Sequence, residues 1–134
     1  MNAEKYTQKS LAAVKDAQEL TIKNQNQQIE QIHLLSALLQ QDGGLVPQLL
    51  KKMGITVESL NAAVNQELSK LPRVTGSGRE ADKYYVSRDV DAALTKAESI
   101  AEGMKDDFVS VEHLLLALIE CPDATVKELF RTYN

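Results

Sequence analysis

Two apolar segments of this sequence repeat each other almost residue for residue. IEQIHLLSALLQ at residues 29–40 and VSVEHLLLALIE at residues 109–120 align without a gap at an offset of 80 positions. Each contains one histidine, His33 or His113, followed by a nearly unbroken run of leucine and alanine. A helix that is apolar on almost every side must be buried on almost every side. Each segment is therefore predicted to be the central helix of a small helical unit.

The positions around these segments also match at the same offset. Thr7 and Ser87 both suit a helix N-cap, where a side-chain oxygen accepts a bond from an orphan amide. The identical pairs, concentrated at apolar positions, are Ala12/Ala92, Ala13/Ala93, Ala17/Ala97, His33/His113, Leu34/Leu114, Leu35/Leu115, Ala37/Ala117, Leu38/Leu118, Val46/Val126 and Leu49/Leu129. Such matches indicate two copies of one unit. We predict a single all-α domain over residues 1–134. It contains two pseudo-twofold-related repeats of about four helices, at 5–71 and 87–134, joined by a linker at 72–86.

Composition limits the classes of function. The chain has 134 residues, is 43% hydrophobic and only 4% aromatic, and contains no tryptophan, which favours one aliphatic helical core. Its net charge of −4 argues against nucleic-acid binding, which needs clustered lysine and arginine. The single Cys121 allows no internal disulfide, and no apolar run approaches the ~20 residues of a membrane span. We expect a soluble, cytoplasmic protein without a membrane partner.

The second repeat is shorter than the first. In the first repeat, a helix at 56–71 carries an apolar stripe that would cover its neighbours. Asn134 aligns with Gly54, so nothing in this sequence corresponds to that helix. We therefore expect seven helices of an eight-helix arrangement, in a chain that is part of a longer polypeptide. Apolar surface on the helices at 111–119 and 126–130 should be left partly exposed.

Two motifs carry a family resemblance. EHLLLAL in the second central helix and LPRVTGSG at residues 71–78 resemble the N-terminal domain of the Clp family of AAA+ unfoldases, and the second motif favours the ClpB disaggregases over ClpA and ClpC. The resemblance covers essentially the whole chain. It implies a non-enzymatic module that captures unfolded or aggregated polypeptides for threading by the AAA+ ring. The parent would be a homohexamer that uses ATP and Mg²⁺ and cooperates with an Hsp70 system.

The resemblance also implies which residues bind substrate. The family pattern points to Thr7 at the first helix start, Asp106 before the second central helix and Glu112 at its beginning. Carboxylates at a helix start could orient a client backbone or a basic side chain. Thr7 and Glu112 also have purely structural explanations, since Thr7 suits an N-cap and Glu112 complements a helix dipole. The sequence has no G-x-x-x-x-G-K-[ST] phosphate loop, so this chain is expected to hold no cofactor and to catalyse no reaction.

Two alternatives deserve a test. An adaptor-docking domain of a ClpA- or ClpC-type protease unfoldase is the nearest. ClpC-type domains carry glutamate before the histidine in both repeats to recognise phosphoarginine, whereas this chain has Ile32 before His33, which argues against that ligand. A small hydrolase or metal protein using His33 and His113 is the second. No cluster at ligand spacing accompanies either histidine, so both are predicted to be packed structural residues, and the site is expected to hold no metal.

Overall fold

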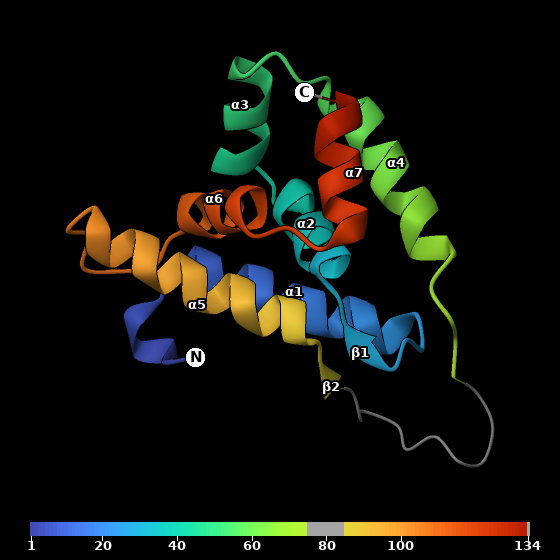
Figure 1. Ribbon diagram of the computed structural model, residues 1–134, viewed down its shortest axis with the longest axis horizontal. Coiled ribbons are helices and arrows are strands. Elements are labelled where there is room, and N and C mark those ends of the chain that lie inside the picture. Colours follow the sequence, from blue (N-terminus) through green and yellow to red (C-terminus); the bar gives the residue numbers. More distant parts are fainter. Residues whose placement is uncertain (75–84, 134) are drawn as a thin grey trace.

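The computed structural model describes residues 1–74 and 85–133, and over this part of the chain it is a helical protein with very little strand (Figure 1). The elements in chain order are the 3₁₀ turn η1 (Ala3–Lys5), α1 (Gln8–Lys23), β1 (Gln28–Ile29), α2 (Gln31–Gln40), α3 (Leu45–Lys52), α4 (Val57–Ser69), β2 (Tyr85–Val86), α5 (Arg88–Gly103), α6 (Val111–Glu120) and α7 (Ala124–Tyr133). The predicted all-α class is confirmed. Most of the predicted linker, residues 75–84, lies outside the described residues.

Local sequence signals set most of the helix boundaries. Thr7 Oγ1 accepts the Ser10 amide at 3.1 Å and begins α1, and Ser87 Oγ accepts the Val90 amide at 3.1 Å and begins α5. Gly54 follows α3 with φ at +84°, the left-handed conformation that glycine adopts without strain. Thr56 stands at the N-cap of α4, as the sequence pattern of a threonine before this helix indicates, but its side chain makes no capping hydrogen bond.

The two central helices form the middle layer of the molecule. In α2 every residue from Gln31 to Leu39 is buried, and α6 buries most of its residues. The long helices α1 and α5 lie below them, with a cleft between the two, and α3, α4 and α7 stand on the other side (Figure 1). This layered burial explains why the two apolar segments lack the polar face of an ordinary surface helix.

Two short parallel contacts reveal the pseudo-twofold symmetry. Ile29 in β1 pairs with Val86 in β2, and Tyr6 forms an isolated bridge with Val109. An offset of 80 residues converts the first pair into the second. Each contact ties the residue before the first helix of one repeat to the residue before the central helix of the other. Two-residue strands are too short to show a periodicity, so the sequence pattern did not predict them.

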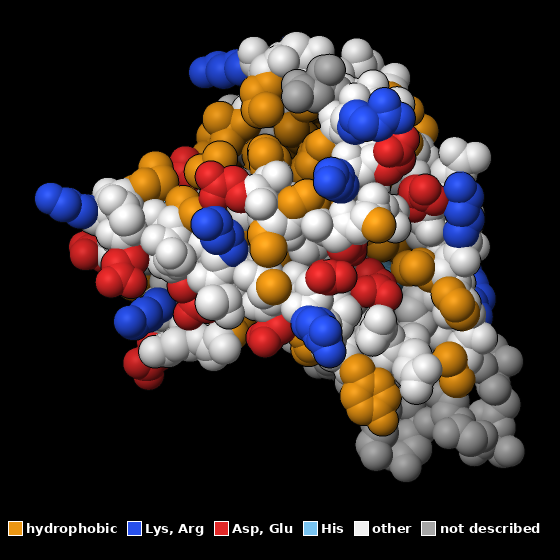
Figure 2. Space-filling view, in the orientation of Figure 1, with side chains coloured by type: hydrophobic (Ala, Val, Ile, Leu, Met, Phe, Trp, Pro, Cys, Tyr) orange, Lys and Arg blue, Asp and Glu red, His pale blue; other side chains and the backbone are white. Residues whose placement is uncertain are grey.

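The symmetry fails where α4 packs on α2. Ser36 and Leu39 of α2 are 4% and 7% exposed, on the face where Gln40 hydrogen-bonds Asn61 of α4. The corresponding Leu116 and Ile119 of α6 are each 37% exposed. Figure 2 shows hydrophobic side chains gathered over α6 and the neighbouring α3. The predicted exposure is therefore confirmed for α6.

The same prediction is wrong for α7. Val126 is fully buried and Leu129 is 7% exposed. The reason is that α7 packs against α2 and α4 of the first repeat as well as against α6. The first repeat therefore buries the apolar face of α7. The prediction was wrong because it compared each repeat only with itself and left out contacts between the repeats.

No helix among the described residues combines the length and the apolar character needed to cross a membrane.

Candidate functional site

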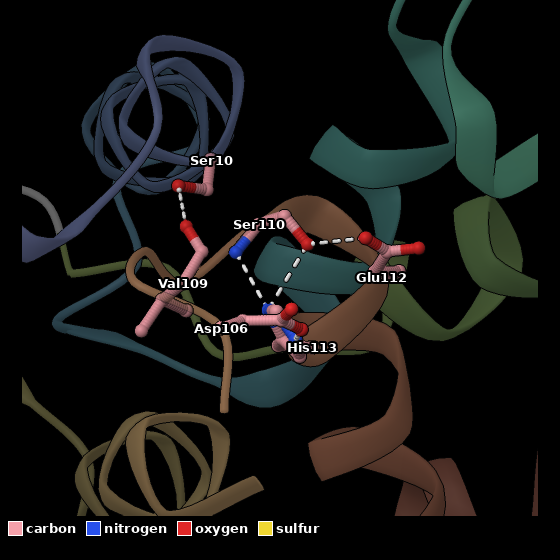
Figure 3. Close-up of polar contacts among 6 residues, drawn as sticks. All are labelled: Ser10, Asp106, Val109, Ser110, Glu112 and His113. Atoms are coloured by element: carbon pink, nitrogen blue, oxygen red, sulfur yellow. Dashed lines mark hydrogen bonds and ion pairs between the residues drawn. The ribbon is translucent and has the colours of Figure 1, made fainter. Parts of the chain in front are cut away.

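The structure brings the three predicted binding residues into one region, around the bridge between Tyr6 and Val109. The Thr7 amide donates to the Val109 carbonyl at 3.0 Å. The same carbonyl accepts the Ser10 hydroxyl at 2.8 Å, which fixes the start of α1 against the loop before α6 (Figure 3). Thr7 is thus both the N-cap of α1 and a neighbour of the loop that carries Asp106.

A hydrogen-bonded network joins Asp106 to Glu112 through His113 and Ser110 (Figure 3). His113 Nε2 lies 2.8 Å from Asp106 Oδ2, and His113 Nδ1 accepts the Ser110 amide at 2.9 Å. The Ser110 hydroxyl donates to Glu112 Oε1 at 2.9 Å. Because Nδ1 accepts a backbone N–H, the proton is on Nε2 and points at Asp106. The buried imidazole therefore holds a carboxylate whose side chain is 47% exposed.

The first repeat contains the same network with different chemistry. His33 Nδ1 accepts the Glu30 amide at 2.9 Å, and His33 Nε2 lies 2.8 Å from Asn26 Oδ1. At the fixed offset Asn26 corresponds to Asp106, and Ile32 corresponds to Glu112. Ile32 is only 2% exposed. The first repeat therefore has no carboxylate at the positions of Asp106 and Glu112, although Glu30 stands at the N-cap of α2. A glutamate at position 32 would enter the core.

This geometry argues against chemistry at the histidines. His33 and His113 are 0% and 1% exposed, and both ring nitrogens of each have hydrogen-bond partners. Neither ring retains a lone pair for a metal ion or a proton from a substrate. Residues 1–74 and 85–133 hold no group of three or more potential metal-ligating side chains. Each histidine instead joins the start of its central helix to the loop before it through two hydrogen bonds.

Burial of His33 predicts a loss of stability in mild acid. Burial lowers the pKa of His33 to about 4 from its usual 6.5, so the unfolded chain binds a proton more readily than the folded chain. Stability is then fully present above about pH 6.5 and falls as the pH drops towards 4. Between about pH 7.5 and about pH 5, we expect a loss of about 2 kcal/mol from this group, measured by urea unfolding. The His33→Gln variant should lack this part of the pH dependence, and an unchanged slope would contradict the assignment.

An acidic cleft opens beside Asp106. It has a volume of about 480 Å³, and its lining residues come from η1, α5 and the loop before α6: Lys5, Glu98, Ala101, Glu102, Asp106, Asp107, Phe108 and Val109. Four carboxylates face one lysine, so the cleft favours cationic groups. Phe108, which lines the cleft, is 53% exposed, and Met104 in the same loop is 55% exposed. The sequence indicated Asp106, but it did not reveal that Glu98 and Glu102 share the cleft.

A second, apolar cleft of about 220 Å³ lies between α1 and α5. Its lining residues are Met1, Val14, Ala17, Gln18, Ile29, Leu34, Val86, Val90, Asp91 and Leu94. The residues from the two long helices belong to the second half of α1 and the first half of α5, and Ile29 and Val86 come from β1 and β2, so this cleft lies towards the β1–β2 end of the layer. The cluster around Thr7 and Asp106 lies at the opposite end, where α1 begins and α5 ends. Sequence reasoning missed the apolar cleft, because it treated these residues as core.

The comparisons with known proteins agree on one family. The Clp repeat (R) N-terminal domain matches residues 5–133. The chaperone protein ClpB of Clostridium tetani is 35% identical over 134 residues, which is all of this chain and 16% of the chaperone. Among solved structures, the Hsp104 N-terminal domain of Candida albicans has a TM-score of 0.82 and 27% identity over 95% of this chain and 80% of that one. A ClpV N-domain has a TM-score of 0.74 and 21% identity, over 98% of this chain and 80% of that one.

Proposed function

This chain belongs to the Clp repeat N-terminal domain family, and we propose that it is the substrate-binding module of a ClpB-type disaggregase. Its task would be to capture unfolded or aggregated polypeptides before an ATP-driven ring threads them. The observation that carries this proposal is the cleft between α1 and α5. Its lining is mostly apolar, so it suits the apolar segments that an unfolded client exposes. The chain spans 16% of the length of the ClpB relative, so the activity of the whole protein is part of the proposal.

Two further observations support a peptide-binding role. The ClpV N-domain of the same fold was solved in complex with a VipB peptide. In this chain, Thr7, Asp106 and Glu112 surround the loop at the other end of the α1–α5 layer, beside exposed Met104 and Phe108. A client that fills the apolar cleft could therefore reach a polar site on the same layer. Hydrophobic contact would supply affinity, and the carboxylates would select among sequences.

In our proposal, other domains of the parent protein carry out the catalytic steps. The parent would be a cytoplasmic homohexamer that binds ATP and Mg²⁺ through other domains and works with an Hsp70 system. This domain would neither bind nor hydrolyse nucleotide, because the sequence offers no phosphate loop.

An NMR titration tests the capture of clients. We expect an unfolded apolar polypeptide to shift the amide signals that line the α1–α5 cleft and those around Thr7, Asp106 and Glu112, while a folded protein leaves the spectrum unchanged. Shifts confined to α3, α4 and α7 would place the binding surface elsewhere and overturn the site.

Glu112→Ala is expected to weaken client binding more than it weakens the fold. Glu112 complements the α6 dipole and accepts one hydroxyl bond, which together contribute only about 1 kcal/mol to stability. Client affinity, measured by titration calorimetry, should fall about fivefold if the carboxylate contacts the client. Glu58→Ala is the matched control, because Glu58 is in the first turn of α4. Equal client affinity in both variants, or a loss of several kcal/mol in urea unfolding of Glu112→Ala, would make Glu112 a structural residue.

A further inference from the structure

The first repeat already binds an extended peptide segment, which is the chain's own residues 71–74. After α4 ends, this segment crosses the loop at residues 24–28. The Val74 amide donates to the Gln25 carbonyl at 2.8 Å, and the Asn26 side-chain amide donates to the Pro72 carbonyl at 3.1 Å. Asn26 is consequently only 3% exposed. The loop acts here as a receptor for polypeptide backbone.

The loop at residues 104–108 has the same backbone conformation. Gln25 and its counterpart Lys105 both have left-handed backbones, with φ at 58° and 61°. The Asn26 amide donates to the Thr21 carbonyl at 3.0 Å, and the Asp106 amide donates to the Ala101 carbonyl at 2.9 Å. In the first repeat the Val74 amide donates to the Gln25 carbonyl, and the Lys105 carbonyl is the equivalent acceptor in the second repeat.

In the second repeat this receptor loop is open. All five residues from Met104 to Phe108 are exposed, and no described residue donates a hydrogen bond to the Lys105 carbonyl. The loop thus offers a binding geometry whose use is demonstrated within the same molecule.

The chemistry of the open loop selects a different occupant. The Asn26 amide can donate to a carbonyl, but the Asp106 carboxylate can only accept, so a carbonyl in the position of Pro72 would face a negative charge. Among the described residues only His113 donates to Asp106. The adjoining cleft adds Glu98, Glu102 and Asp107. A positively charged side chain fits this arrangement, and the exposed ring of Phe108 can stack on it.

We propose that the loop at residues 104–108 binds an extended client segment in the manner of residues 71–74, with a client lysine or arginine in the acidic cleft. One backbone N–H of the client donates to the Lys105 carbonyl. This inference rests on the proposed function, because it assumes that clients are polypeptides. It adds a selectivity that the apolar cleft cannot supply: basic residues that flank apolar segments should be preferred over neutral or acidic ones.

Two capped heptapeptides test the proposal. Both contain alanine and leucine, with arginine at the centre of one and citrulline, its uncharged analogue, at the centre of the other. The arginine peptide should bind the wild-type chain about fivefold more tightly, as expected for a partly exposed ion pair. Its amide shifts should centre on residues 104–109, and the preference should shrink at high salt. Methylating the backbone nitrogens one at a time should identify a single amide that is required.

The Asp106→Asn variant is the matched control for the two-peptide experiment. Asparagine reproduces the first repeat, where His33 bonds Asn26 at 2.8 Å, so the variant should fold normally. It should bind the two peptides equally. If the wild type also binds them equally while still binding an unfolded apolar protein, the basic selectivity is wrong and client capture stands. If neither the peptides nor the unfolded protein binds, the proposed function fails with it. Retention of the fivefold preference in Asp106→Asn would move the cation site away from this loop.

Discussion

Replacing Gln31 by leucine is expected to lower the free energy of unfolding by about 3 kcal/mol. Gln31 is fully buried at the start of α2. Its Nε2 donates to the carbonyls of Asp89 and Cys121, each at 2.9 Å, and its Oε1 accepts the Asp123 amide at 2.8 Å. One side chain thus ties the central helix of the first repeat to the start of α5 and to the turn before α7. Leucine would fill the space but leave three backbone groups without this partner.

Urea unfolding of the purified chain measures this effect. Gln27→Leu is a matched control, because Gln27 is exposed and makes no side-chain bond to a described residue, and its stability should change by less than about 0.5 kcal/mol. Hydrogen exchange should also show faster opening of α7 in Gln31→Leu, since the Asp123 that caps α7 loses its anchor. Equal stability of the two variants would show that water replaces the glutamine without cost.

The sequence was sufficient to predict the parts of the fold that depend on local pattern. The unbroken apolar runs around His33 and His113 placed both central helices, because burial on all sides leaves no room for a polar face. Thr7 and Ser87 marked the starts of α1 and α5 through their side-chain oxygens. Each of these signals acts within a few residues, so one sequence contains all the information that they need.

Interactions between the two repeats could not be predicted from such local signals. Gln31 looks like any polar residue at a helix start, and its counterpart at the fixed offset is the apolar Val111. Its three partners are 58 to 92 residues away in the chain. His113 and Asp106 are only 7 residues apart in the chain. Their proposed role in binding depends on the exposed loop at residues 104–108, which the sequence pattern did not predict. The binding roles of Thr7, Asp106 and Glu112 remain predictions, although the structure brings the three residues together.

The exposed face of α6 gives the last large prediction, which compares two symmetry-related apolar positions, one buried and one exposed. Leu39→Ala should cost about 3 kcal/mol, because Leu39 is 7% exposed on the α2 face that α4 covers. Ile119→Ala, at the equivalent position of α6, should cost only about 1 kcal/mol, because Ile119 is 37% exposed. Both values come from urea unfolding of the same chain. Similar costs would mean that α6 is covered in solution, for example by a second molecule, which sedimentation would detect.

Adding the missing cover should make the two positions alike. Residues 55–71 follow Gly54, and Asn134 aligns with Gly54, so a copy of residues 55–71 appended after Asn134 would place a second α4 over Leu116 and Ile119. In the extended chain, the cost of Ile119→Ala should rise towards the ~3 kcal/mol of a buried position. A control extension replaces the buried residues of the stripe, Leu60, Val64 and Leu68 in the original, by serine and should leave the cost unchanged. If the intact extension also has no effect, the exposed face of α6 does not accept a helix like α4, and the eight-helix arrangement is wrong. The coupling between Ile119 and the added stripe therefore decides the prediction, because it separates specific packing from a general effect of chain length.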